Sequence, residues 1–148
     1  MNVHLTALVI VLFCSIPLHG QTQTSAGVQF AGCYEIVSQR WHPGNEDASP
    51  IPSRFELRNE QADKRSTDLF QMRGIPPGRN DWERLWLWRP TSDGVWVSWG
   101  RGLGGFRGTL KQDRNGEFVG QIKEWCDSRC EWKKQVAKIR IRKARCAE

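Results

Sequence analysis

Histidine is scarce in this chain, with three copies among 148 residues. His4 and His19 lie near the N-terminus, so His42 is the one imidazole in the rest of the chain. A catalytic relay through histidine therefore has one possible centre, and no cluster of acids and histidines has the spacing of a metal site. Residues 100–105 match the glycine spacing of a dinucleotide-binding motif, but strand-like alternation follows where that motif needs a helix. We therefore expect a non-enzymatic protein without metal or cofactor.

Long apolar runs are also rare, and the one that is present covers residues 5–18. It is too short to span a bilayer comfortably, but it has the length of the apolar part of a secretion signal. We predict a signal peptide over residues 1–20, with cleavage at residue 26 as the alternative, and one domain over residues 30–146. The protein is then exported, to the periplasm or outside the cell. Lipid anchoring at Cys14 and a retained membrane anchor are the alternatives.

Removal of that segment leaves an even number of cysteines, namely Cys33, Cys126, Cys130 and Cys146. An even number of cysteines in a small exported domain indicates disulfides, here with three possible pairings. We favour Cys33–Cys146, which brackets the whole predicted domain, together with Cys126–Cys130. A zinc site made by the four thiolates is the alternative, and an oxidising compartment argues against it.

Apolar and polar residues alternate through much of the segment between Cys33 and Cys146, which predicts strands. Asn115-Gly116 is the strongest hairpin signal in the chain. Eight strands are predicted, over residues 32–38, 54–58, 68–73, 85–88, 95–100, 106–111, 118–123 and 137–142. Loops rich in Pro, Gly, Asn and Asp are predicted over residues 40–52 and 74–83.

Eight short strands joined mostly by hairpins predict an all-β fold, either a sandwich or an eight-stranded antiparallel up-and-down barrel. We favour the barrel, because closure removes exposed sheet edges and a Cys33–Cys146 disulfide would join its first and last strands. Such a barrel is just wide enough to be filled by side chains or to hold one small ligand. The residues predicted to face the interior are Tyr34, Ile36, Phe55, Leu57, Phe70, Met72, Val95, Val97, Trp99, Phe106, Leu110, Phe118, Ile122, Ile139 and Ile141.

The opening Gly32-Cys33-Tyr34 resembles the start of lipocalin-like (calycin) barrels, whose first strand begins with Gly-x-Trp. The strand Val95-x-Val97-x-Trp99, followed by Gly104-Gly105 and a final Cys146, resembles small exported bacterial proteins of this kind. Tyr34 stands where those barrels have Trp, and no helix follows the last strand. The resemblance implies that the Tyr34 ring lies inside the closed end of a lipocalin-like barrel. It also implies binding of a small or apolar ligand.

Aromatic residues are the candidates for such a ligand site: Tyr34, Phe55, Trp86, Trp88, Trp99 and Phe106. Trp86 and Trp88 alternate with Leu85 and Leu87, so one of the two pairs must face outwards. The tryptophans either pack in the core and on the outer wall, or form an exposed platform with Trp96 for a sugar, lipid or peptide.

Basic residues gather near the C-terminus, where residues 133–146 contain seven Lys and Arg and no acid, although the net charge of the chain is only +6. Lys138, Arg140 and Arg142 alternate with apolar residues and must share the outer face of a strand. We favour a solvated face. The alternative is contact with an anionic envelope polymer or lipid surface. Nucleic acid is not an expected partner of an exported protein.

Two functions follow from these patterns. We predict an exported, non-catalytic, lipocalin-like protein that binds a small or apolar ligand. The alternative is an interaction module, such as a barrel-type inhibitor or a cell-envelope component, that uses surface Trp, the basic strand or the two long loops. A cavity open at one end of the barrel favours the first function, and a filled interior favours the second.

Overall fold

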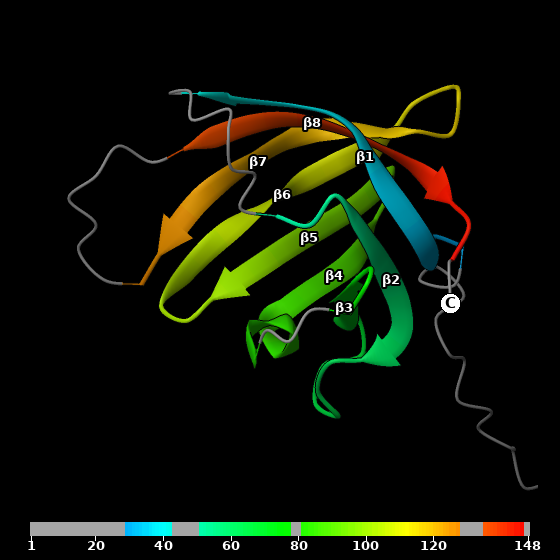
Figure 1. Ribbon diagram of the computed structural model, residues 1–148. Coiled ribbons are helices and arrows are strands. Elements are labelled where there is room, and N and C mark those ends of the chain that lie inside the picture. The colour runs from blue at the N-terminus through cyan, green and yellow to red at the C-terminus, as the bar shows by residue number, and fades with distance from the viewer. Residues whose placement is uncertain (1–28, 43–50, 78–80, 128–134, 147–148) are drawn as a thin grey trace, which may run out of the picture.

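The computed structural model describes residues 29–42, 51–77, 81–127 and 135–146. Their strands are β1 (Gly32–His42), β2 (Arg54–Gln61), β3 (Phe70–Gly74), β4 (Trp86–Thr91), β5 (Gly94–Arg101), β6 (Gly104–Gln112), β7 (Phe118–Cys126) and β8 (Val136–Ala144). One short 3-10 helix, η1 (Asp81–Leu85), precedes β4. Every strand pairs antiparallel with the next, and β8 pairs with β1, so the sheet closes into the predicted up-and-down barrel (Figure 1).

A disulfide joins Cys33 to Cys146 at the seam between β1 and β8, with 5.2 Å between the two Cα atoms. This confirms the predicted pairing and the predicted closure of the barrel. Cys126 is disulfide-bonded as well. Cys130, its predicted partner, lies outside the described residues, as does the predicted signal peptide.

The first strand is longer than predicted and contains a β-bulge. Ile36 pairs with Ile141, but Gln39 rather than Ser38 pairs with Ile139, because the register shifts between Ile36 and Ser38. The extra residue reverses the alternation, so that Trp41 points into the barrel and is 5 % exposed. The prediction of a loop from residue 40 was therefore wrong for residues 40–42. The predicted loop over residues 74–83 contains the beginning of η1.

Side chains from all eight strands form one hydrophobic core. Every residue predicted to face the interior belongs to it, with Ile36 partly buried at its edge. The residues that the alternation did not place there are Phe30, Trp41, Ile51, Trp86, Trp88 and Ala137. Phe30 precedes β1 and Ile51 precedes β2, so both cover the core from outside the regular strands.

The barrel has two distinct ends. The disulfide end contains Cys33, the C-terminus of β8 and the turns that follow β2, β4 and β6 (Figure 1). One of those turns is the predicted Asn115-Gly116 hairpin, where Gly116 has a φ of +80° and the Asp113 carboxylate accepts the backbone N–H of Asn115 at 2.9 Å. The far end contains His42, η1 and the β5–β6 hairpin.

Candidate functional site

The six aromatic residues predicted to bind a ligand all lie in the core: Tyr34, Phe55, Trp86, Trp88, Trp99 and Phe106. Trp86 is the most exposed of them, at 7 %. Its indole N–H donates to the carbonyl oxygen of Gly100 at 3.2 Å. Trp86 and Trp88 thus face the interior, and Leu87 between them is the half-buried residue of the outer wall. The structure gathers the six residues in one cluster, and ligand binding by them stays a prediction.

Aromatic rings of strands that are not neighbours touch across the barrel. Phe55 on β2 meets Trp99 on β5 edge to face, with ring centroids 5.3 Å apart. Trp41 on β1 meets Phe106 on β6 in the same way, at 5.1 Å. Rings at about 4.5–7 Å are in direct packing contact, so no ligand fits between them. Side chains of the protein therefore fill the two layers of the interior in which these contacts lie.

Phe30 and Tyr34 close the disulfide end. Both rings pack against Phe118, with centroid distances of 5.5 Å and 5.6 Å. The Tyr34 hydroxyl donates a 2.7 Å hydrogen bond to the carbonyl oxygen of Phe30, which ties the segment before β1 to the barrel. Burial raises the pKa of Tyr34 to about 12. The prediction that the Tyr34 ring lies inside the closed end is confirmed.

Among the described residues, Trp41 and Trp99 each have an indole N–H group in the interior without a hydrogen-bond acceptor. Trp99 pairs with Phe106 across β5 and β6, and Phe106 contacts Trp41, so both donors lie in one layer near the far end. Trp88 differs, because its N–H donates to the carbonyl oxygen of Arg58 at 2.9 Å. A buried donor without an acceptor costs about 1–3 kcal/mol. A small group with an acceptor atom would therefore be stabilising in this layer.

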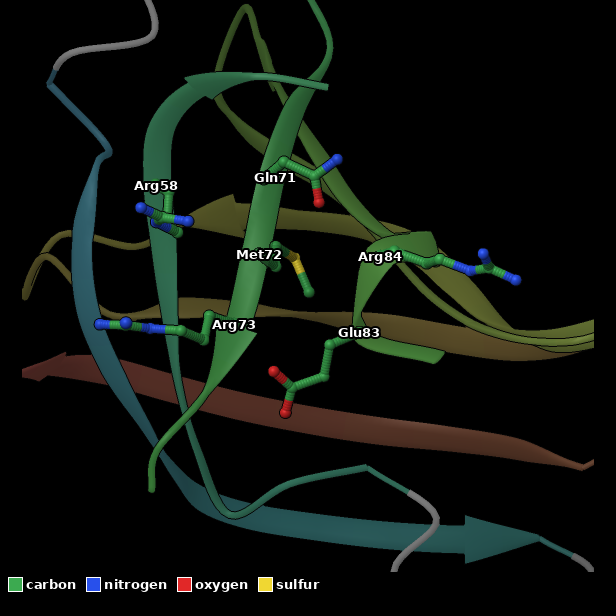
Figure 2. Close-up of a pocket in the computed structure, with 6 residues that line it drawn as sticks. All are labelled: Arg58, Gln71, Met72, Arg73, Glu83 and Arg84. Atoms are coloured by element: carbon green, nitrogen blue, oxygen red, sulfur yellow. The ribbon is translucent and has the colours of Figure 1, made fainter. Parts of the chain in front are cut away.

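A pocket of about 180 Å³ opens at the side of the barrel (Figure 2). Its lining residues are Arg58, Gln71, Met72, Arg73, Glu83 and Arg84. It lies where β3 separates from β4, because these strands pair only through Phe70 and Gln71. No pattern in the sequence indicates this pocket, since it arises where regular pairing stops.

The arginines of the pocket do not converge on a common point. Arg58 forms an ion pair with Glu60 at 2.7 Å, and Arg73 forms one with Glu56 at 2.8 Å. Figure 2 shows the side chains of Arg73 and Arg84 extending in opposite directions. The pocket therefore does not concentrate positive charge as an anion site would.

Two tryptophans of the outer wall lie against arginines. The guanidinium of Arg89 is 5.3 Å from the Trp96 ring centroid, and that of Arg107 is 5.3 Å from the Trp125 ring centroid. Both tryptophans are half-buried. With Trp86 and Trp88 inside the barrel, the exposed platform that would have combined them with Trp96 does not form. The cation–π pairs instead give the wall a mixed aromatic and basic character.

The basic strand faces outwards as predicted, but its three cations differ in their partners. Arg140 contacts the Glu117 carboxylate at 2.8 Å, and this hydrogen bond raises the pKa of the guanidinium. Arg142 contacts Glu35 through its Nε, at 2.6 Å. Lys138 is exposed and has no acidic partner among the described residues. Of the three cations, Arg140 and Arg142 are therefore neutralised, whereas Lys138 is not neutralised by any described residue.

Histidine, metal-binding side chains and membrane-spanning helices would be other sources of function within the described residues. His42 is exposed at the end of β1. Within residues 29–42, 51–77, 81–127 and 135–146, no three His, Cys, Asp or Glu side chains lie close enough together to hold a metal ion. No helix in those same residues is long and apolar enough to cross a membrane.

Comparison with protein-family models, with curated proteins and with solved structures finds no significant match to this chain. The class of protein is therefore defined by the structure itself. It is an all-β protein whose eight-stranded antiparallel barrel is closed by a disulfide, an architecture compatible with a lipocalin-like fold.

Proposed function

We propose that this chain is an exported, non-enzymatic interaction module that contacts its partner through the outside of its barrel. The observation that carries the proposal is the contact of aromatic rings across the barrel, between Phe55 and Trp99 and between Trp41 and Phe106. An eight-stranded barrel can either be filled or hold one small ligand, and these contacts occupy the space that a ligand would need. The Cys33–Cys146 disulfide supports export, because such bonds persist in oxidising compartments.

The outer wall has the residue types that recognition surfaces use. Trp96 with Arg89 and Trp125 with Arg107 place aromatic rings and guanidinium groups together on neighbouring strands. Trp and Arg are enriched where protein surfaces bind partners, because they combine a large contact area with directed hydrogen bonds. This chemistry supports binding through the wall without any catalytic group.

Binding of a small ligand in a lipocalin-like barrel is the second candidate function. The unpartnered N–H groups of Trp41 and Trp99 favour it, because a ligand with an acceptor atom would satisfy them. Such a ligand would have to displace the ring contact between Trp41 and Phe106, which now fills that layer.

Benzene tests whether the barrel already contains a dry apolar cavity, because it enters such a cavity but not a filled core, and mass spectrometry tests for a retained ligand of any polarity. We expect no shift in the unfolding temperature of the wild-type barrel when benzene is added. Phe106→Ala creates a cavity and serves as the matched control, and benzene should raise its unfolding temperature. Native mass spectrometry of protein from its own host should show the mature polypeptide without a small molecule. A retained small molecule, or stabilisation of the wild type by benzene, would favour the second candidate.

A further inference from the structure

Four exposed cations lie close together on the outer wall, on four consecutive strands. They are Arg40 on β1, Lys138 on β8, Lys123 on β7 and Arg107 on β6, and they are called the basic band below. Arg40 and Lys138 are direct cross-strand partners, and so are Lys123 and Arg107. Lys138 is the partner of Gln121, two residues from Lys123. Strand spacing and rise therefore place successive Cα atoms of the band about 5–8 Å apart.

Among the described residues, no acidic side chain faces the band. β6 and β8 contain no Asp or Glu. Glu35 on β1 lies towards the disulfide end and binds Arg142. Glu124 on β7 is in the interior-facing register opposite Phe106, and its carboxylate accepts the backbone N–H of Gln135. No ion pair therefore joins a band residue to a carboxylate within the described part of the chain.

Four like charges at this spacing repel one another, and like charges directly opposite on paired strands are destabilising. Two other cations of the same strands are neutralised, since Arg140 has Glu117 and Lys111 has Asp93 at 2.8 Å. An uncompensated row of cations attracts anions, and the attraction grows with the number of charges that an anion can meet at once. Arg107 also packs on Trp125, which restrains its guanidinium before a partner binds.

We propose that the basic band binds a linear acidic polysaccharide through its carboxylate groups. The inference rests on the proposed function, because it names the partner class of the outer wall. The band crosses four of the eight strands, which is half the circumference of a closed barrel. A flat bilayer touches a convex wall along a narrow line, whereas a flexible polymer can follow all four strands. Guanidinium groups suit carboxylates, since they bind them with two parallel hydrogen bonds.

The test compares two triple variants of the disulfide-bonded mature protein for binding to polygalacturonate. One variant combines Arg40→Gln, Lys123→Gln and Lys138→Gln in the band. The control combines Lys64→Gln, Arg65→Gln and Arg114→Gln, exposed cations in the turns of the disulfide end. Both remove the same charge. We expect the band variant to lose at least about tenfold in affinity and the control to lose no more than about twofold. Wild-type affinity should fall about tenfold between roughly 50 and 200 mM salt.

Several results would overturn the inference. Equal losses in the two variants would mean that net charge alone drives binding. Tighter binding to anionic phospholipid vesicles, or to a single-stranded oligonucleotide, would assign the band to a membrane or to nucleic acid. If the wild type binds none of these probes while benzene still fails to enter the barrel, the band proposal fails and the proposed function stands. Entry of benzene into the wild type would instead remove the proposed function.

Discussion

The two ends of the barrel are both packed with aromatic rings, but they differ in how the polar atoms of those rings are satisfied. At the disulfide end the Tyr34 hydroxyl has an acceptor, the Phe30 carbonyl, and a covalent bond joins β1 to β8. Towards the far end, Trp41 and Trp99 bury N–H groups that have none. Because an unpaired buried donor loses its hydration without compensation, the two indole N–H groups lower the stability of the far end, which retains the capacity to accept a polar group.

Removing the disulfide is the strongest test of this difference. Cys33→Ser with Cys146→Ser opens a loop that spans 113 residues and should cost about 4–5 kcal/mol in the chain-entropy model. The matched control is Cys126→Ser with Cys130→Ser, for which the same relation gives about 2 kcal/mol. Urea unfolding of both variants measures the two costs. Similar losses in the two would mean that the seam between β1 and β8 does not depend on the covalent bond.

Truncation of Tyr34 tests the packing of the disulfide end. Tyr34→Ala removes a ring that is 2 % exposed and contacts Phe55 and Phe118, and it should cost about 3–5 kcal/mol. The free energy of unfolding from denaturant titration gives the value. A cost below about 1 kcal/mol would show that the ring does not fill the core at this end and that its likeness to the Trp of lipocalin-like barrels is misplaced.

Alkaline pH should weaken the same end through the Tyr34 hydroxyl. Burial raises its pKa from 10.0 to about 12, so the native state holds the phenolic proton more tightly than the unfolded state does. This contribution is complete below pH 10 and is lost as the pH rises towards 12, by up to about 3 kcal/mol. Tyr34 is the one tyrosine of the chain, so ultraviolet absorbance reports its ionisation directly. Tyr34→Phe is the control, and an equal loss of stability in that variant would assign the effect to other groups.

Strand alternation predicted the eight strands, and the positions of Cys33 and Cys146 on the first and last of them favoured a barrel over a sandwich. Alternation could not reveal the bulge after Ile36, since the extra residue reverses the two faces without any sequence signal that distinguishes it. Trp41, placed in a loop by the sequence, is for that reason a core residue and part of the unpaired layer.

The basic band depends on register rather than on sequence proximity. Arg40, Arg107, Lys123 and Lys138 are distant in the chain, and only the pairing of β1 with β8, of β8 with β7 and of β7 with β6 brings them together. The cluster that the sequence did indicate, around Arg140 and Arg142, is neutralised by acids on other segments. The basic cluster seen in the sequence therefore lies on the same wall of the barrel as the band, but of its three strand cations only Lys138 belongs to the band.

The smallest expected effect concerns the unpaired donors themselves. Trp41→Phe and Trp88→Phe each replace a buried indole by a phenyl ring, so both lose similar apolar area. Only Trp88 gives up a hydrogen bond, to the carbonyl of Arg58, and that carbonyl is then left without this donor. We expect Trp88→Phe to cost about 1 kcal/mol more than Trp41→Phe in urea unfolding. The same comparison can be made with protein purified from its own host and with protein refolded from denaturant. If the two variants cost the same in the first preparation, and Trp41→Phe costs less only in the second, an acceptor is bound between Trp41 and Trp99 in the host. In that case the layer that contains Trp41 and Trp99 near the far end would be a ligand-binding site, and the second candidate function would be supported.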